Sequence, residues 1–500
     1  MQLNNDSLTD LFIIGGGING VGIANDAAGR GLSVTLCEQG DLACATSSKS
    51  SKLIHGGLRY LEYYEFRLVR EALKEREVLL NKAPHIIHPL RFVMPHKKQL
   101  KPAWIIRIGL FLYDHLGKRQ KLPASHGINL RQHPAGQPLQ ETLKQGFIYS
   151  DCWVDDARLV VLNAVQAREL GATILTRTRF IGAQRQSDHW QITLEDVNTQ
   201  EKHALKAKVL VNAAGPWAEE VLSKELHLPA KNHISLVKGS HIIVPKLYAG
   251  DFAFILINPD NRIIFVIPYL DNFSLIGTTD IAYAGDPFAA EISPEEINYL
   301  CQAVGNYFAK PVSPSDIIWS YSGVRPLHAE NTDNPSAISR DYTLELDHPA
   351  GQAPILTIFG GKITTYRKLA EHVLHDLQSF FPQAKPAWTD RAPLPGGNMI
   401  NSDFSAFQNH FLQKYHWLPK EIASRYARSY GTLAEKFLHN AQGMEDLGRH
   451  FGAGLYEAEV NYLCTHEWAK TSEDILWRRT KLGLYLSNEE MEKLDEWLKA

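Results

Sequence analysis

A strand, a glycine-rich turn and a helix near the N-terminus restrict what this chain can fold into more than any other feature. The apolar run 11–14 predicts a buried parallel strand, and three glycines follow it in the spacing G-x-G-x-x-G. Here Gly15 permits a tight turn, Gly17 lets the backbone approach a pyrophosphate, and Gly20 lets the next helix pack closely on the strand. The stretch therefore predicts an α/β domain that binds a dinucleotide.

An acidic residue follows the second predicted strand of this unit. The apolar run 32–37 ends at Glu38, whose carboxylate can accept hydrogen bonds from both ribose hydroxyls of an adenosine. The same carboxylate would repel a 2′-phosphate, so NADP is disfavoured. This order of elements indicates an ADP-containing dinucleotide, either NAD or FAD: a strand, the glycine turn, a helix, a second strand and an acidic residue.

The segment after Glu38 differs from an NAD-binding unit, which would usually enter its next helix quickly. Residues 45–60 instead form a long loop that is rich in serine and ends in Leu-Ile-His-Gly-Gly-Leu-Arg-Tyr. Its hydroxyl and backbone N–H groups can cradle a pyrophosphate, and Gly56 and Gly57 allow close contact with a flat ring. The alternative, a flexible serine-rich linker, does not explain such an ending.

Composition and charge exclude several other classes of protein. A chain of 500 residues predicts about three domains, and 44% hydrophobic with 21% charged residues is typical of a folded globular protein. The formal net charge of −3 gives no indication of the basic surface that a nucleic-acid-binding protein needs. The five cysteines are odd in number, far apart and never spaced C-x-x-C, which predicts reduced thiols rather than disulfides or a metal site.

The sequence shows no signal for export and none for spanning a membrane. Residues 1–10 are polar and acidic, without the basic and apolar regions of a signal peptide. No stretch approaches the roughly 18 uninterrupted apolar residues of a spanning helix. We therefore expect a protein that is soluble or attached to a membrane surface.

The rest of the chain predicts a second sheet and a helical C-terminal part. Runs at 172–176 and 191–195 are typical of strands that return to the first domain. Residues 206–217 form an apolar strand that ends in a small-residue turn, which suits either a bound dinucleotide or an ordinary strand end. Short β-rich runs between 234 and 279 (234–237, 242–244, 263–267 and 274–276) predict a separate, largely antiparallel sheet. A further strand and glycine turn lead into a helix at 355–370, and 403–500 is helical and amphipathic.

The segment 97–121 combines basic and large apolar side chains. It contains the run from Trp104 to Tyr113, and its seven lysines and arginines accompany a single acid, Asp114. This predicts attachment to an anionic membrane surface, with the aromatic rings at headgroup level. The alternative is a core helix whose lysines are solvated at the rim. The helical tail is the other candidate for membrane contact.

Three separated stretches together resemble one family of flavoenzymes. Residues 14–31, 47–60 and 360–370 are similar to the FAD-dependent glycerol-3-phosphate dehydrogenases, and so is Trp477-Arg-Arg-Thr-Lys-Leu-Gly in the tail. The similarity is greatest to the bacterial, respiratory, quinone-linked type. It implies a Rossmann-like FAD-binding domain of the glycine-oxidase type, a substrate domain with a mixed or antiparallel sheet, and a C-terminal helical domain.

The resemblance also implies a division of the chain. The expected segments are 1–85, 151–230 and 331–385 for the FAD-binding domain, 86–150 and 231–330 for the substrate domain, 386–397 for a linker and 398–500 for the C-terminal helical domain.

The family's activity implies a reaction and its partners. Such enzymes oxidise sn-glycerol 3-phosphate to dihydroxyacetone phosphate by hydride transfer to N5 of FAD and pass the electrons to ubiquinone or menaquinone. The expected location is the cytoplasmic side of the cell membrane, peripherally attached, with a homodimer as one assembly. The alternatives are an oxidase that uses oxygen on the same scaffold, an NAD-dependent dehydrogenase, and a non-catalytic FAD-binding protein.

Four residues match the family's catalytic positions. Arg59 and Arg325 match its substrate-site arginines. A planar guanidinium suits this role because it can bind a phosphate through two hydrogen bonds. His55 matches the candidate base for the hydroxyl proton, with a structural histidine as the alternative. Lys362 matches a lysine near the flavin, where a cation would stabilise developing negative charge. The expected substrate-binding residues are Arg59, Tyr60, Arg325 and Lys362.

The cofactor site is expected to draw on most of the motifs above. The residues are Gly15, Gly17, Gly20, Glu38, Thr46, Ser47, Ser51, Lys52, Leu53, Ala214, Gly215, Gly361, Ile363 and Thr364. The loop at 278–280, Thr-Thr-Asp, is more typical of a structural than of a catalytic element.

Overall fold

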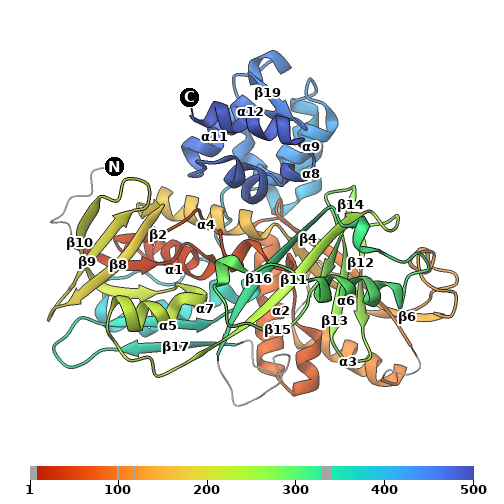
Figure 1. Ribbon diagram of the computed structural model, residues 1–500, viewed down its shortest axis with the longest axis horizontal. Helices are drawn as coiled ribbons and strands as arrows, with labels where there is room; N and C mark the ends of the chain where they lie inside the picture. The colour runs from red at the N-terminus through yellow and green to blue at the C-terminus, as the bar shows by residue number, and fades with distance from the viewer. Residues whose placement is uncertain (1–7, 98–100, 118, 329–340, 500) are drawn as a thin grey trace.

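The structure is a computed structural model that describes residues 8–97, 101–117, 119–328 and 341–499. Two large sheets lie side by side, and the helices of the C-terminal part stand above them in Figure 1. Among the described residues, no helix combines the length and the apolar character that a membrane crossing requires.

The first sheet is a parallel, dinucleotide-binding type of sheet. Its main path runs β17-β18-β10-β1-β2-β7, in which all neighbours are parallel except β17 and β18. Strands β8 and β9 continue it from β10 as an antiparallel extension. The bounds are β1 Leu8–Ile14, β2 Val34–Glu38, β7 Thr173–Thr176, β8 Thr178–Arg185, β9 Trp190–Asp196, β10 Lys202–Asn212, β17 Tyr342–Asp347 and β18 Ile355–Gly360.

Strand β1 is apolar without interruption because both of its faces are covered. Leu11 and Ile13 pack into a core with three helices, α1 (Ile18–Gly29), α4 (Asp156–Glu169) and α7 (Tyr366–Asp376). Phe12 and Ile14 face the other way, into a core that includes β8 and β9. This confirms the predicted buried strand.

The second sheet is almost wholly antiparallel, with β12 and β4 as its parallel pair. Its path runs β15-β11-β14-β13-β12-β4-β6-β3, with β16 beside β11 and β5 beside β6. The bounds are β3 Leu53–Ile54, β4 Ile87–Pro95, β5 His126–Asn129, β6 Gln145–Val154, β11 Ile234–Pro245, β12 Phe252–Ile257, β13 Ile263–Tyr269, β14 Phe273–Gly277, β15 Ile281–Ala282 and β16 Trp319–His328. Helices α2 (Phe66–Lys82) and α3 (Ala103–Leu116) pack in one core of this sheet, and α6 (Pro294–Gly305) packs in the other.

The C-terminal part is helical, as expected, but it also contains a short hairpin. Its helices are α8 Phe404–Lys414, α9 Lys420–Tyr430, α10 Glu435–Leu438, α11 Glu457–His466 and α12 Asn488–Lys499, and the hairpin is β19 His450–Gly452 with β20 Leu455–Tyr456. The apolar core of these helices is continuous with the core around α1, α4 and α7. The predicted α/β architecture with two sheets and a helical C-terminal domain is thereby confirmed.

Several local predictions differ from the structure. The runs 234–237 and 242–244 belong to one long strand, β11, because pairing with β16 continues through the polar residues between them. The chain after the serine-rich loop becomes helical only at Phe66, since a 3₁₀ turn occupies Leu58–Tyr63. The Pro-rich stretch 386–397 is irregular but packed, because Lys82 donates to two of its carbonyl oxygens at 2.5 and 2.6 Å.

The proposed domain boundaries stay a prediction, and two strands do not follow them. Strand β3 lies in the second sheet although its residues fall within the segment 1–85. Strand β6 pairs with β4 as far as Val154, past the boundary set at residue 150. Both exceptions bring the loop after Glu38 against the second sheet, which places it between the two sheets.

Candidate active site

A pocket of about 650 Å³ opens at the carboxyl ends of the parallel strands in the first sheet. This edge is where α/β sheets bind their ligands. The predicted cofactor residues that line it are Gly15, Gly17, Glu38, Thr46, Ser47, Ala214, Gly215 and Gly361. Residues that are distant in sequence thus meet in one place, since β1, β2, β10 and β18 are neighbours in the sheet.

The glycine turn after β1 has the geometry that its spacing predicts. Gly15 has a φ of +109°, and a Cβ on Gly20 would lie 2.0 Å from the oxygen of Gly15. Glu38 accepts hydrogen bonds from the N–H groups of Gly16 and Gly40, both at 2.8 Å. Burial raises the pKa of Glu38. The carboxylate is therefore held in place between the turn and the loop that follows β2.

The opposite wall of this pocket is built on a second glycine turn. Asn19 in the first turn of α1 donates to the carbonyl oxygen of Gly360 at 3.2 Å, and Gly361 has a φ of +110°. Among the described residues, nothing donates a hydrogen bond to the buried side-chain oxygen of Asn19. Backbone N–H groups at a helix start, an acid and an unpartnered polar atom fit the ADP part of a dinucleotide.

The loop 53–60 meets the turn at 360–365 beside this pocket. The N–H of His55 donates to Oγ1 of Thr364 at 3.3 Å. The ammonium of Lys362 lies 4.0 Å from the ring centroid of Tyr60. A Cβ on Gly57, which has a φ of +74°, would overlap the Tyr60 ring. Three of the predicted catalytic and substrate residues thus belong to two segments in contact.

Arg325 lies on β16, on the side of the second sheet that faces these loops. Its guanidinium forms an ion pair with Asp280 and donates to Oγ1 of Thr278 at 3.2 Å and to the carbonyl oxygen of Thr279 at 3.0 Å. A Cβ on Gly360 would lie 3.6 Å from the oxygen of Pro326, so the residue after Arg325 adjoins the turn before Lys362. The 278–280 loop, which the sequence predicts to be structural rather than catalytic, therefore orients the candidate substrate arginine.

Arg59 lies on a different wall from Arg325. Its guanidinium donates to the hydroxyl of Tyr63 at 3.2 Å and lines a second, larger groove of about 1740 Å³. The structure therefore connects Arg59 with the groove and Arg325 with the 278–280 loop.

The remaining predicted cofactor residues support the loop from behind. The ammonium of Lys52 forms a buried ion pair with Asp156 at 2.8 Å. Leu53 pairs with Trp153 in the second sheet, and Ile363 opens the turn that leads into α7. The hydroxyl of Ser51 lies 2.8 Å from Nε2 of His241.

Two residues near this site were not predicted to belong to it. Burial, with the charges of Arg325 and Lys52 nearby, lowers the pKa of His241 well below its usual range, so its ring is neutral. The hydroxyl of Tyr113 accepts a hydrogen bond from the N–H of Gly56 at 2.8 Å. His241 lies in no local motif, and only the fold brings it to the loop. The prediction that the Tyr113 ring lies at headgroup level is wrong, because the ring is buried in a core of the second sheet and its hydroxyl bonds to Asp151.

Comparison with known proteins assigns both parts of the chain. Residues 10–367 match the family model described as FAD dependent oxidoreductase. Residues 387–499 match the model described as C-terminal domain of alpha-glycerophosphate oxidase.

Full-length relatives narrow this further. A glycerol-3-phosphate dehydrogenase of Pseudomonas aeruginosa is 57% identical over 491 residues, which cover 98% of this chain and 95% of that protein. The aerobic glycerol-3-phosphate dehydrogenase of Escherichia coli is 53% identical, with 98% and 97% covered. This chain belongs to the FAD-dependent glycerol-3-phosphate dehydrogenase family.

A further relative and a solved structure are also similar to this chain. A D-erythritol 1-phosphate dehydrogenase of Brucella abortus is also 53% identical, over 98% of this chain and 97% of that protein. The structure of a Bacillus halodurans glycerol-3-phosphate dehydrogenase complexed with FAD matches with a TM-score of 0.78 and 26% identity, and the match covers 99% of this chain and 94% of that one.

Membership of the family decides between the alternatives for the cofactor. The chain is an FAD-dependent oxidoreductase, so the NAD-dependent and the non-catalytic alternatives are set aside. The pocket at the strand ends would hold the ADP part of FAD, and the contacting segments 53–60 and 360–365 would flank its ring. The roles of the individual site residues remain predictions.

Proposed function

We propose that this protein oxidises sn-glycerol 3-phosphate to dihydroxyacetone phosphate and delivers the electrons to a quinone at a membrane. The observation that carries the reaction is the junction of two segments, where the backbone after Arg325 adjoins the turn that precedes Lys362 beside the FAD pocket. This backbone contact supports a site in which the Arg325 guanidinium and the Lys362 ammonium, which come from two different sheets, act on one substrate.

Each of the predicted site residues would have a separate role in the reaction. FAD, when bound, supplies the hydride acceptor. Arg325 would bind the substrate phosphate with its planar guanidinium, held in orientation by Thr278 and Asp280. Lys362 would stabilise the negative charge that develops at the reacting oxygen, and the His55 ring would accept the hydroxyl proton.

The identity of the polyol phosphate is open to a direct test. D-Erythritol 1-phosphate is a phosphorylated polyol with one more hydroxyl-bearing carbon, and a relative named for it is as similar as the Escherichia coli protein. We expect kcat/KM for sn-glycerol 3-phosphate to exceed that for D-erythritol 1-phosphate by about tenfold or more, measured with a soluble dye as acceptor. The reverse order would make the protein an erythritol-phosphate dehydrogenase.

Helix α3 supports membrane attachment. Leu110 and Tyr113 are buried against the second sheet, but Trp104, Ile108 and Phe111 are 65%, 52% and 60% exposed. The outer face of α3 is therefore apolar and open, which disagrees with the alternative of a core helix. In Figure 1 this helix lies at the bottom of the molecule, away from the C-terminal domain at the top.

Basic side chains accompany the α3 face. Lys101 and Arg119 adjoin the helix and pair with Glu62 and Asp114. Lys97 and Lys121 instead donate to the carbonyl oxygens of Asn306 and Ser402, and Lys98 and Lys118 lie outside the described residues. Each lysine or arginine near an anionic leaflet contributes about 1 kcal/mol of binding free energy. This arrangement supports peripheral attachment on the cytoplasmic side, where the leaflet is anionic.

The larger groove supports a route for a quinone. Ile105, Ile108 and Leu112 of α3 line it on one side, and Arg59 and Leu58 line it on the other. A long apolar tail suits such a lining, because apolar surface leaves water as the tail enters. The groove thus leads from the exposed face of α3 to the loop 53–60 beside the FAD pocket. A homodimer remains a further prediction.

The outer face of α3 can be tested without touching the groove. We expect Trp104→Ser combined with Phe111→Ser to lower co-sedimentation with anionic vesicles by tenfold or more, since burying one such side chain contributes about 1.5–3 kcal/mol. Dye-linked activity should stay at the level of the unaltered protein. The matched control is Ile400→Ser, because Ile400 is 87% exposed and lies outside α3. Undiminished sedimentation of the double variant would place the membrane contact elsewhere, with the helical tail as the next candidate.

A further inference from the structure

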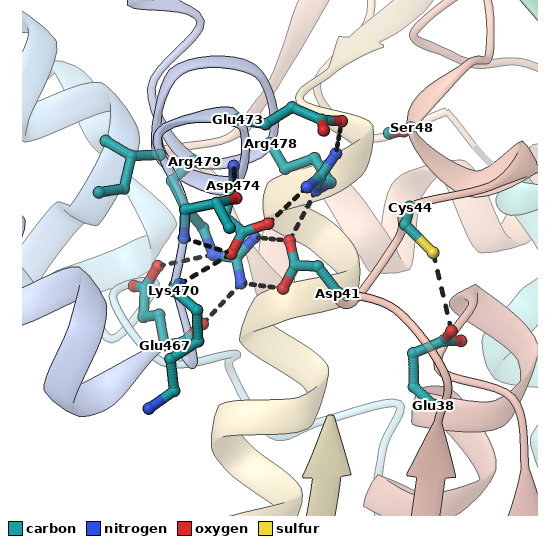
Figure 2. A network of polar contacts seen from close by, with 12 residues as sticks. Glu38, Asp41, Cys44, Ser48, Glu467, Lys470, Glu473, Asp474, Arg478 and Arg479 are labelled. Carbon is teal, nitrogen blue, oxygen red and sulfur yellow. Dashed lines mark hydrogen bonds and ion pairs between the residues drawn. The ribbon is translucent and has the colours of Figure 1, made fainter. Parts of the chain in front are cut away.

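The C-terminal domain contacts the loop after Glu38 through a buried network of ion pairs (Figure 2). The guanidinium of Arg479 donates to both oxygens of Asp41, each at 2.8 Å. Arg478 adds a third bond to the same carboxylate, from Nε at 2.6 Å. Arg479 is 0% exposed and Asp41 is buried, so water does not weaken these contacts.

Both arginines are held from their own side as well. Arg478 donates to Glu473 at 2.6 Å and to Asp474 at 2.5 Å, and Arg479 donates to the carbonyl oxygen of Glu467 at 2.6 Å. Figure 2 shows how these acids surround the two guanidinium groups. The arginines therefore form a fixed support and not a flexible surface contact.

A second connection reaches the same loop. Asp474 also binds the guanidinium of Arg177 at 2.5 Å, and the N–H of Arg177 donates to the carbonyl oxygen of Gly40 at 2.9 Å. Gly40 in turn donates to the carboxylate of Glu38. The C-terminal domain thus contacts Asp41 directly and is connected to Gly40 through Arg177.

The loop that it holds forms part of the FAD pocket. Glu38 is bonded to the N–H groups of Gly16 and Gly40, and the N–H of Ala43 donates to the oxygen of Gly16 at 3.2 Å. Residues 38–44 therefore close around the glycine turn, and Glu38 and Cys44 line the pocket. Asp41 is outside the set of lining residues, and its side chain points to the C-terminal domain.

We propose that Arg478 and Arg479 position the loop 38–44 for FAD, so that the C-terminal domain controls the affinity for the cofactor. The inference uses the FAD assignment and is independent of the substrate and of the quinone. Asp41 is buried and charged, and without its arginines it would have to reach water by moving the loop. Glu38 and Ala43 would move with it, because both are tied to Gly16.

The test compares two arginines of the full-length protein that each pair with a buried carboxylate. Arg479→Gln should raise the dissociation constant for FAD about tenfold, which corresponds to ~1.4 kcal/mol, when FAD is titrated into the apoprotein and followed by flavin fluorescence. The control is Arg425→Gln, since Arg425 pairs with buried Glu459 at 2.5 and 2.7 Å entirely within the C-terminal domain. It should lower the melting temperature and leave the FAD dissociation constant unchanged.

Two milder variants keep the test decisive if Arg479→Gln does not fold. Asp41→Asn removes the charge with little change in shape, and Arg479→Lys keeps a charge but cannot bond both oxygens. We expect Asp41→Asn to weaken FAD binding. Arg479→Lys should also weaken FAD binding, but less than Arg479→Gln does. If these variants bind FAD with the constant of the unaltered protein, or no more weakly than Arg425→Gln does, the network only joins two domains and the proposal is wrong.

Discussion

Replacing Arg325 with lysine should raise the KM for sn-glycerol 3-phosphate by roughly ten- to hundredfold. A lysine ammonium cannot reproduce a planar, bidentate contact with phosphate, and each charge-assisted hydrogen bond lost costs about 1.5–3 kcal/mol. The lysine variant would also lose the hydrogen bonds that Arg325 donates to Thr278 and Thr279, which orient the guanidinium. Initial rates over a range of substrate concentrations, with a soluble dye as acceptor, measure the change.

The controls for Arg325 separate phosphate binding from general damage. Activity with unphosphorylated glycerol, which is low at best, should change little, because glycerol offers no phosphate. Arg262→Lys is the matched variant, since Arg262 pairs with Asp260 at 2.7 Å in the turn between β12 and β13 of the same sheet and lines neither the pocket nor the groove. An equal loss with both substrates would remove Arg325 from the phosphate site.

Replacing Arg158 with methionine should lower the free energy of unfolding by about 3–5 kcal/mol, because the buried carboxylate of Glu467 would lose its ion-pair partner. Arg158 on α4 and Glu467 of the C-terminal domain are both fully buried and form a two-point ion pair, with Nη2 and Oε1 2.9 Å apart. Arg158 also donates to the carbonyl oxygen of Ser429 at 3.1 Å. Chemical denaturation followed by circular dichroism measures the loss.

A surface pair provides the comparison for Arg158. Lys414 and Glu435 are 2.6 Å apart, but both are about half exposed. Lys414→Met should therefore change the free energy of unfolding by less than about 1 kcal/mol. If the two variants unfold at the same denaturant concentration, the buried pair does not stabilise the junction between α4 and the C-terminal domain.

The dinucleotide site was predictable because its signals are local. The turn after β1 needs glycine at fixed spacings, and a strand covered on both faces must be apolar throughout. The same is true of the second turn at Gly360 and Gly361. Since parallel strands end at one edge of a sheet, these separate motifs had to meet.

Other parts of the site depend on contacts between distant residues. Asp41 and Arg478 are 437 positions apart, and no spacing in the sequence connects them. The Thr278 and Asp280 contacts with Arg325 depend on the pairing of β11 with its neighbours. The sequence of α3 predicts a membrane-facing helix and leaves a core helix as the alternative. Only the packing shows that Phe111 faces outward while Tyr113 faces the loop at Gly56.

The most direct test of the central claim is anaerobic mixing of the FAD-loaded protein with sn-glycerol 3-phosphate. The visible absorbance of the oxidised flavin should disappear within the turnover time, and an added quinone should restore it faster than oxygen does. Faster recovery with oxygen would make the protein an oxidase. An absorbance that sn-glycerol 3-phosphate leaves unchanged would contradict the proposed reaction itself.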